Sequence, residues 1–174
     1  QSGDPTPSGG HDDPTIPPVP STTEPQTPHI VSTASIGVTG DVLMHGPVIF
    51  AGKQGSSYDY SKMFQYVKPY YEKYDLMVAN LETTLGGTAA GEYKGYPNFN
   101  CPDQIVDALK GAGVDLMLTA NNHSYDTGFA GFTRTLDVIK EKGLLTLGTQ
   151  SEEDATEYIV QDINGIKVGM ICYT

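Results

Sequence analysis

Three short clusters of polar side chains contain the residues of this sequence that are best suited to chemistry. Each cluster directly follows an apolar run, and each combines groups that bind cations or transfer protons. The clusters hold Asp41 with His45, then Asn80 with Glu82, and then Asn121, Asn122 and His123 with Asp126. Carboxylate, imidazole and amide oxygen groups are typical ligands of divalent metals such as manganese, iron and zinc. If the clusters meet in the fold, they predict a site for a divalent metal.

Each cluster on its own also has an ordinary structural interpretation. A Gly-Asp pair after a strand is common as a turn or a helix cap, which would explain Asp41 without a metal. Asn80 and Glu82 could likewise cap a loop. A lone histidine such as His123 is more often a hydrogen-bonded structural residue than a ligand. A shared site is favoured because all three clusters stand at predicted strand ends of one sheet.

The elements that must position these clusters are short apolar strands that alternate with helices. Strands are predicted over residues 34–43, 75–80 and 115–120, and each ends at one of the clusters. Helices are predicted over residues 103–113 and 131–143. This alternation predicts an α/β fold with a mostly parallel sheet and right-handed crossovers. The carboxyl ends of parallel strands share one edge of the sheet, so we expect the three clusters to converge there.

The remaining elements are predicted to frame this sheet. Residues 59–74 have helical spacing with Ser61 as a candidate N-cap, and Pro69 implies a kink or two short helices. Further strands are expected over residues 145–147, 158–162 and 166–173, with Asn164-Gly165 as the turn of a hairpin. Because the chain stops in a strand without a closing helix, the sequence predicts a partial domain.

A long loop is predicted over residues 86–100, which are rich in Gly, Asn and Tyr. Three aromatic residues in it, Tyr93, Tyr96 and Phe99, could line a substrate groove, because loops at this edge of a sheet often carry function. The alternative is an ordinary covering loop.

The first 33 residues differ sharply in composition from the rest. They contain eight of the 12 prolines, many Ser, Thr and Gly residues, and no Lys or Arg. Such a segment cannot bury enough apolar surface to offset its ordering entropy. We therefore predict a disordered Pro/Thr/Ser-rich linker over residues 1–33 and a folded domain over residues 34–174. A stalk of this kind after a start without Met predicts an extracellular protein that is tethered to the cell surface through it.

Charge and cysteine content narrow the function classes. The formal net charge is −11 and Arg134 is the single arginine, which argues against nucleic acid as a partner. An acidic chain is compatible with bound divalent cations. Cys101 and Cys172 are far apart and have no ligand spacing, so both are predicted to be ordinary buried thiols.

The three clusters and their flanking residues resemble one known family. The matching stretches are residues 38–44 (VTGDVLM), 79–83 (ANLET) and 120–128 (ANNHSYDTG), supported by Gly148 and the closing residues 168–174. They resemble the capsule-synthesis CapA (poly-gamma-glutamate synthesis) family, a branch of the calcineurin-like metallophosphoesterase superfamily. The similarity covers nearly all of residues 34–174.

This resemblance implies a fold and a set of residue roles. The fold is a four-layer α/β/β/α sandwich, present here in part, with a centre for two divalent ions (Mn, Fe or Zn). By position, Asp41 is a ligand of the first metal, Glu82 takes the place of the bridging carboxylate and Asn122 ligates the second metal. His123 matches the histidine that stabilises the leaving group or the transition-state charge. Further contacts are expected from His45, Asn80, Asn121 and Asp126.

One departure from the superfamily pattern affects this site. The superfamily supplies further metal-binding histidines from later strands, and this sequence has no histidine after His123. We therefore expect the second half of a two-metal site to lie outside these 174 residues.

The resemblance also implies a biological role. It predicts a cell-surface protein of capsule or poly-gamma-glutamate biosynthesis with a metal-dependent (phospho)hydrolase-type domain that acts on a phosphoester or an anionic polymer. The alternative is a non-catalytic accessory or export subunit of a membrane-bound polyglutamate synthase that binds the anionic polymer. A third possibility is a surface binding module in which the cluster is vestigial.

Overall fold

The computed structural model describes residues 31–151 and 157–174. Contacts between residues divide the chain into Gln1–Val31 and Ser32–Thr174, and the fold described below is that of the second unit. The linker predicted for residues 1–33 therefore lies outside the described residues, except for its last three positions.

The centre of the second unit is a parallel sheet of four short strands. In spatial order they are β1 (Ile36–Asp41), β4 (Leu76–Asn80), β5 (Leu116–Leu118) and β6 (Leu145–Leu147). Every neighbouring pair is parallel. One of the two inner strands, β4, is apolar and buried along its first four residues, as expected for a parallel strand covered on both faces. The predicted α/β fold with a mostly parallel sheet is confirmed.

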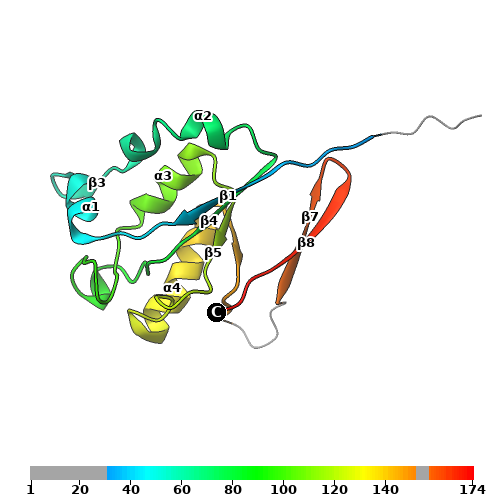
Figure 1. Ribbon diagram of the computed structural model, residues 1–174. Helices are drawn as coiled ribbons and strands as arrows, with labels where there is room; N and C mark the ends of the chain where they lie inside the picture. The colour runs from blue at the N-terminus through cyan, green and yellow to red at the C-terminus, as the bar shows by residue number, and fades with distance from the viewer. Residues whose placement is uncertain (1–30, 152–156) are drawn as a thin grey trace, which may run out of the picture. The chain divides into compact units, whose positions relative to one another are not determined.

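Helices cover one face of this sheet (Figure 1). The strand order follows the chain order, so right-handed crossovers place every connecting helix on the same side. The two longest helices are α3 (Gln104–Ala112) and α4 (Gly128–Glu141). Their buried residues Leu109 and Ile139 join Met77 and Met117 of the sheet in one apolar core.

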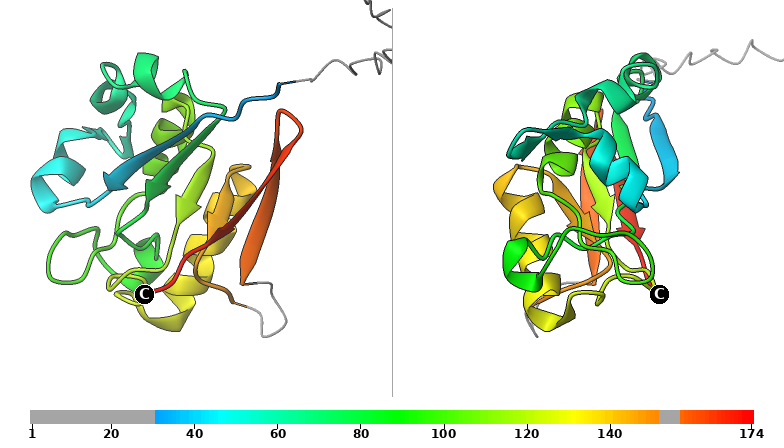
Figure 2. Two further views of the ribbon diagram at one scale, coloured as in Figure 1. Left: turned by 45° about the vertical axis from the view of Figure 1, so that its right-hand side comes forward. Right: turned by 90° about the vertical axis from the view of Figure 1, so that its left-hand side faces the viewer.

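An antiparallel hairpin covers the opposite face. It consists of β7 (Tyr158–Ile163) and β8 (Ile166–Ile171). Both turn residues have positive φ, 54° at Asn164 and 84° at Gly165, which is the geometry that an Asn-Gly hairpin turn requires. Figure 2 shows the hairpin as a ribbon separate from the parallel sheet. The predicted hairpin is confirmed.

The packing of the hairpin gives the unit three layers. Apolar side chains of the hairpin, among them Ile159, Ile163 and Met170, meet Val78 and Leu116 of the sheet in a second core. The layers are therefore helices, parallel sheet and hairpin, which correspond to the first three layers of the expected α/β/β/α sandwich. Among the described residues no fourth layer covers the hairpin.

The segments between β1 and β4 differ in part from the prediction. Residues 59–74 form two short helices, η1 (Ser61–Phe64) and α2 (Lys68–Tyr71), as Pro69 implied. Ser61 as N-cap was wrong, because η1 begins at Ser61 and its N-cap position is Tyr60, while the Ser61 backbone N–H donates to Asp59 Oδ1 at 2.8 Å.

Three further elements were not expected from the sequence. They are α1 (Gly46–Ala51) and the small pair β2 (Lys53–Gln54) and β3 (Ser57–Tyr58). The predicted loop 86–100 also contains a short helix, η2 (Thr88–Ala90). In the part of the chain that the structure describes, no helix is both long and apolar enough to cross a membrane.

Candidate functional site

The first two polar clusters meet where β1 and β4 end. Asp41 and Asn80 are the last residues of these strands and stand opposite each other in the parallel register. The Asn80 amide Nδ2 donates to Asp41 Oδ1 at 2.8 Å and to Glu82 Oε2 at 3.2 Å. One amide group therefore joins two carboxylates that come from different strands.

The third cluster, which follows β5, joins the same network. Asn121 Nδ2 donates to Asn80 Oδ1 at 3.1 Å and to the Leu81 carbonyl at 3.0 Å. Asn121 Oδ1 accepts the backbone N–H of His123 at 3.1 Å. The three strand ends thus converge, as the order of the parallel strands predicted.

A turn held by Ser124 gives Asn121 this position. Ser124 Oγ donates to the Thr119 carbonyl at 2.6 Å and accepts the backbone N–H of Asn121 at 3.1 Å. The turn directs Asn121 toward β4 and leaves its neighbour Asn122 exposed. Within the described residues, the Asn122 side chain makes no hydrogen bond, so its amide oxygen is available to a ligand.

His123 is held by a carboxylate from its own turn. Its Nδ1 lies 2.8 Å from Asp126 Oδ2, and the two side chains are only 14% and 9% exposed. The same carboxylate oxygen accepts the backbone N–H of Phe99 at 2.6 Å. Because a carboxylate oxygen accepts hydrogen bonds, Nδ1 is the ring nitrogen that carries the proton. This leaves Nε2 of His123 as the nitrogen that can exchange a proton with a bound group.

The ring of Phe99 lies between two histidines. Its centroid is 5.1 Å from that of His45 and 4.6 Å from that of His123, and both contacts are edge-to-face. Phe99 is completely buried. The expectation that Phe99 lines a substrate groove was therefore wrong, since this side chain packs beneath the site. Tyr96, by contrast, is exposed.

His45 reaches the site from α1, where it is the N-cap residue. The contact between His45 and Phe99 is the edge-to-face packing of their rings. The structure thus places His45 beside the network of hydrogen bonds without including it.

The loop that carries Phe99 is anchored by the next residue, Asn100. The Asn100 side chain is buried, accepts the backbone N–H of Gly86 at 3.0 Å and donates to the carbonyls of Gly87 and Glu92 at 3.0 and 3.3 Å. These bonds tie the two ends of the loop 86–100 together and thereby fix Phe99 against the histidines.

Asn100 and Ser124 were missed as residues that shape the site, and Phe99 was expected in a different role. For Ser124 a signal exists, because a serine three residues after an asparagine can close a local turn through its hydroxyl. For Phe99 and Asn100 neither hydrophobic spacing nor a motif indicates which loop side chains turn inward.

The carboxyl group of Glu82 is affected by its surroundings. Burial raises the pKa of Glu82, and the nearby charge of Asp41 and a hydrogen bond with it raise this pKa further, while His123 lowers it. Placing two negative charges close together costs free energy because they repel each other. A bound cation would offset this repulsion.

The candidate ligands named from the sequence could hold one divalent cation. Asp41 and Glu82 supply carboxylates, Asn122 supplies an amide oxygen, and these are hard ligands suited to such an ion. Within residues 31–151 and 157–174, however, no three His, Cys, Asp or Glu side chains form a metal-binding group. A second ion would need ligands beyond those described, so the two-ion centre stays a prediction.

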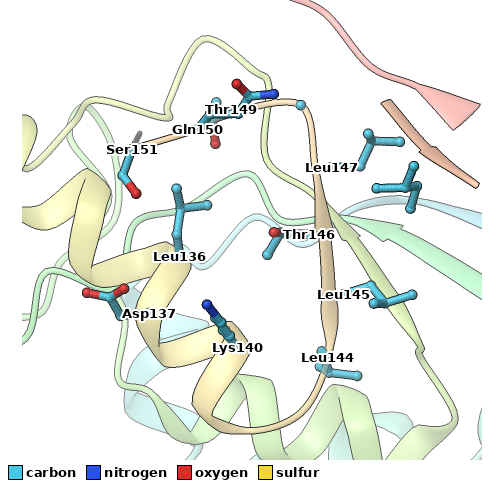
Figure 3. A pocket seen from close by; sticks show the side chains of 12 residues that line it. Leu136, Asp137, Lys140, Leu144, Leu145, Thr146, Leu147, Thr149, Gln150 and Ser151 are labelled. Carbon is cyan, nitrogen blue, oxygen red and sulfur yellow. The ribbon is translucent and has the colours of Figure 1, made fainter. Parts of the chain in front are cut away.

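Two cavities lie at different distances from this chemistry. One of about 280 Å³ adjoins the site, because Gly40 and Asp41 line it together with apolar residues that include Val48 and Phe64. Another of about 370 Å³ lies between α4 and β6, near Leu136 and Thr146 (Figure 3). None of the candidate site residues lines this second cavity.

Comparison with known proteins agrees with this arrangement. Residues 35–174 match the family model described as bacterial capsule synthesis protein PGA_cap. The chain is 26% identical over 145 residues to the capsule biosynthesis protein CapA of Bacillus anthracis, which covers 79% of this chain and 34% of that protein. It is 27% identical over 145 residues to the PGA biosynthesis protein CapA of Bacillus subtilis, which covers 80% of this chain and 37% of that protein.

A shorter match extends the comparison. The uncharacterized protein y4sH of Sinorhizobium fredii is 34% identical over 80 residues, or 42% of this chain and 17% of that protein. The chain spans about a third of the length of the Bacillus relatives. Its three-layer α/β/β arrangement is consistent with the metallophosphoesterase superfamily. Since the family model covers the whole described domain, the chain belongs to the bacterial capsule synthesis (PGA_cap) family, as its resemblance to CapA proteins predicted.

Proposed function

We propose that this domain serves capsule biosynthesis at the cell surface, and that its strand-end site is a metal-dependent centre of the phosphohydrolase type. The observation that carries the proposal is the hydrogen-bonded convergence of Asp41, Asn80, Glu82 and Asn121 at one edge of the sheet. Membership of the PGA_cap family supports the biological role.

The residues divide into ligands and a proton-transfer group. Asp41 and Glu82 would hold a divalent cation (Mn, Fe or Zn) through the oxygens that Asn80 does not use, and Asn122 would add its amide oxygen. When bound, such an ion lowers the pKa of a coordinated water and stabilises negative charge on phosphoryl oxygens. His123, oriented through Nδ1 by Asp126, would carry a second proton on Nε2 when it acts, and would give that proton to the leaving oxygen or stabilise its charge.

The substrate is proposed to be a phosphoester or an anionic polymer of the poly-gamma-glutamate kind. The relatives named for capsule and PGA biosynthesis support the polymer. An extracellular location, with the N-terminal segment as a stalk, is part of the same proposal.

A second candidate function is non-catalytic. It is that of a subunit that binds an anionic polymer and assists a membrane-bound synthase, and the relative named for PGA biosynthesis supports it. The cation would then hold carboxylates of the polymer rather than activate water.

Hydrolysis and polymer binding, measured on the full-length gene product loaded with manganese, distinguish the two functions. Catalysis predicts turnover of p-nitrophenyl phosphate or its diester that His123→Ala abolishes without loss of metal. Polymer binding predicts retention on immobilised poly-gamma-glutamate that chelation of the metal reverses and His123→Ala leaves unchanged. A protein that shows neither activity would contradict both functions.

A further inference from the structure

Neighbouring groups fix the orientation of the Asn121 side-chain amide. The Leu81 carbonyl can only accept a hydrogen bond, so the group 3.0 Å from it must be the Asn121 NH2. The backbone N–H of His123 can only donate, so the group 3.1 Å from it must be Oδ1. If the Asn121 amide were turned over, its NH2 group would face the backbone N–H of His123, and its Oδ1 would face the Leu81 carbonyl. Neither pair could form a hydrogen bond.

This fixed orientation determines that of Asn80 in turn. Because Asn121 presents NH2, Asn80 must face it with Oδ1, at 3.1 Å. The Asn80 NH2 group then points away from Asn121, toward Asp41 and Glu82 at 2.8 and 3.2 Å. Both of its protons are used, one for each carboxylate.

The result for the carboxylates is a defined arrangement. Each gives one oxygen to Asn80, namely Oδ1 of Asp41 and Oε2 of Glu82. The other oxygen of each carboxylate is free of Asn80. Outer-shell hydrogen bonds of this kind orient metal-binding side chains, and their removal typically weakens metal affinity 10–100-fold.

We infer that Asn80 is a positioning residue that holds Asp41 and Glu82 for a divalent cation without ligating the ion itself. Asn121 acts through Asn80 by fixing its amide, and it also joins the pair to the backbone of His123. The inference rests on the proposed function, because it assumes that the two carboxylates are metal ligands.

The position of Asn80 makes a purely structural role a poor explanation. Residues Leu76 to Ala79 form the buried part of β4, whereas Asn80 lies at the end of the strand and is only partly buried. Its side-chain bonds go to Asp41, Glu82 and Asn121, which are all residues of the site.

A double-mutant cycle on Mn²⁺ affinity, measured by electron paramagnetic resonance with the full-length gene product, tests the inference. Asn80→Ala is expected to weaken Mn²⁺ binding about 10–100-fold. Asn121→Ala should weaken it in the same direction, and the double variant should bind about as weakly as Asn80→Ala alone. The matched control is Asn122→Ala, whose effect should multiply with that of Asn80→Ala because Asn122 is a proposed ligand.

Nuclear magnetic resonance of the metal-free protein provides a second readout that needs no bound ion. The side-chain NH2 protons of Asn80 should exchange slowly in the wild type and rapidly in Asn121→Ala. Circular dichroism and thermal melting establish that each variant is folded, and Asn121→Ala carries the test if Asn80→Ala does not fold.

Each outcome has a distinct meaning. Wild-type Mn²⁺ binding that survives in folded Asn80→Ala would overturn the inference and leave the proposed function standing. Unchanged or tighter binding in Asn121→Ala, beside weak binding in Asn80→Ala, would make Asn80 a direct ligand and also overturn it. A wild-type protein that binds no metal would contradict the proposed function instead.

Discussion

At the scale of single residues, the site depends on side chains that orient other side chains. Asn121 fixes Asn80, Asn80 joins Asp41 to Glu82, and Asp126 fixes the ring of His123. Only a few of the polar groups are therefore free for a ligand. Asn122 is exposed and makes no hydrogen bond among the described residues, so it is a better candidate ligand than Asn80 or Asn121, whose amide groups are already hydrogen-bonded.

The contact between Asp126 and His123 gives the first prediction. Asp126→Asn removes the acceptor charge that holds Nδ1 of His123, so the ring loses its fixed tautomer and orientation. If the site is hydrolytic, turnover should fall on the order of 10²-fold or more, while metal content stays unchanged. Steady-state kinetics with p-nitrophenyl phosphate and metal analysis of the same sample check this. Full activity in Asp126→Asn would exclude His123 as the proton-transfer group.

That these polar residues come together was largely predictable from the sequence, but their individual geometry was not. Asp41, Asn80 and Glu82 follow apolar runs, so their place at strand ends follows from the pattern. The choice of Asn121 rather than Asn122 for the network depends on a turn closed by Ser124, and adjacent asparagines cannot be distinguished by spacing.

At the scale of elements, the loop 86–100 supports the site from below. It is tied by Asn100 and inserts Phe99 between His45 and His123. The sequence predicted the loop but not this role, because the burial of Phe99 depends on contacts with distant elements. The short elements α1, β2 and β3 were missed for a similar reason, since each is too short to show a period.

Truncation of Phe99 should therefore affect stability and the site together. Phe99→Ala removes a fully buried ring, and a loss of about 3–5 kcal/mol in the free energy of unfolding is expected. Phe99→Leu is the matched variant and should lose less, because it leaves a smaller cavity. Urea unfolding followed by circular dichroism measures both. A loss below about 1 kcal/mol for Phe99→Ala would show that the ring is not packed as described.

The start of β1 is fastened to the start of β4 by one carboxylate. Asp75 Oδ2 accepts the hydroxyl of Ser35 at 2.6 Å and the backbone N–H of Ser35 at 2.8 Å. These bonds lower the pKa of Asp75 in the folded state. Since the folded pKa lies below the unfolded one, the stabilisation is complete above the unfolded value of about 3.9 and is lost as the pH falls through the folded pKa.

Asp75→Asn should accordingly make the free energy of unfolding depend less on pH at acidic pH. The urea concentration at the midpoint of unfolding is expected to fall further between pH 7 and about pH 3 for the wild type than for the variant. The reason is that only the wild type has a carboxylate at position 75 to protonate. Ser35→Ala, which removes the hydroxyl partner, should reduce the pH dependence in the same direction. Equal pH dependence in wild type and Asp75→Asn would contradict the assigned role of these bonds.

At the scale of the whole molecule, the layers set where chemistry can occur. Helices cover one face of the parallel sheet and the hairpin covers the other, so the carboxyl edge of the strands is where side chains from several elements can meet a ligand. The parallel sheet was predictable because strands and helices alternate along the sequence, and the layer order followed from the resemblance to the CapA family. The number of metal ions was not, since it depends on ligands beyond those that the described residues supply.

The metal content of the full-length protein tests the central claim most directly. After loading with Mn²⁺ or Zn²⁺ and desalting, the wild type should retain near-stoichiometric metal, as measured by mass spectrometry of the eluted metal. Asp41→Ala and Glu82→Gln should each lose it, whereas Asp137→Ala, which changes an exposed carboxylate on α4, should retain it. Metal retained in both site variants, or absent from the folded wild type, would contradict a metal centre at these strand ends.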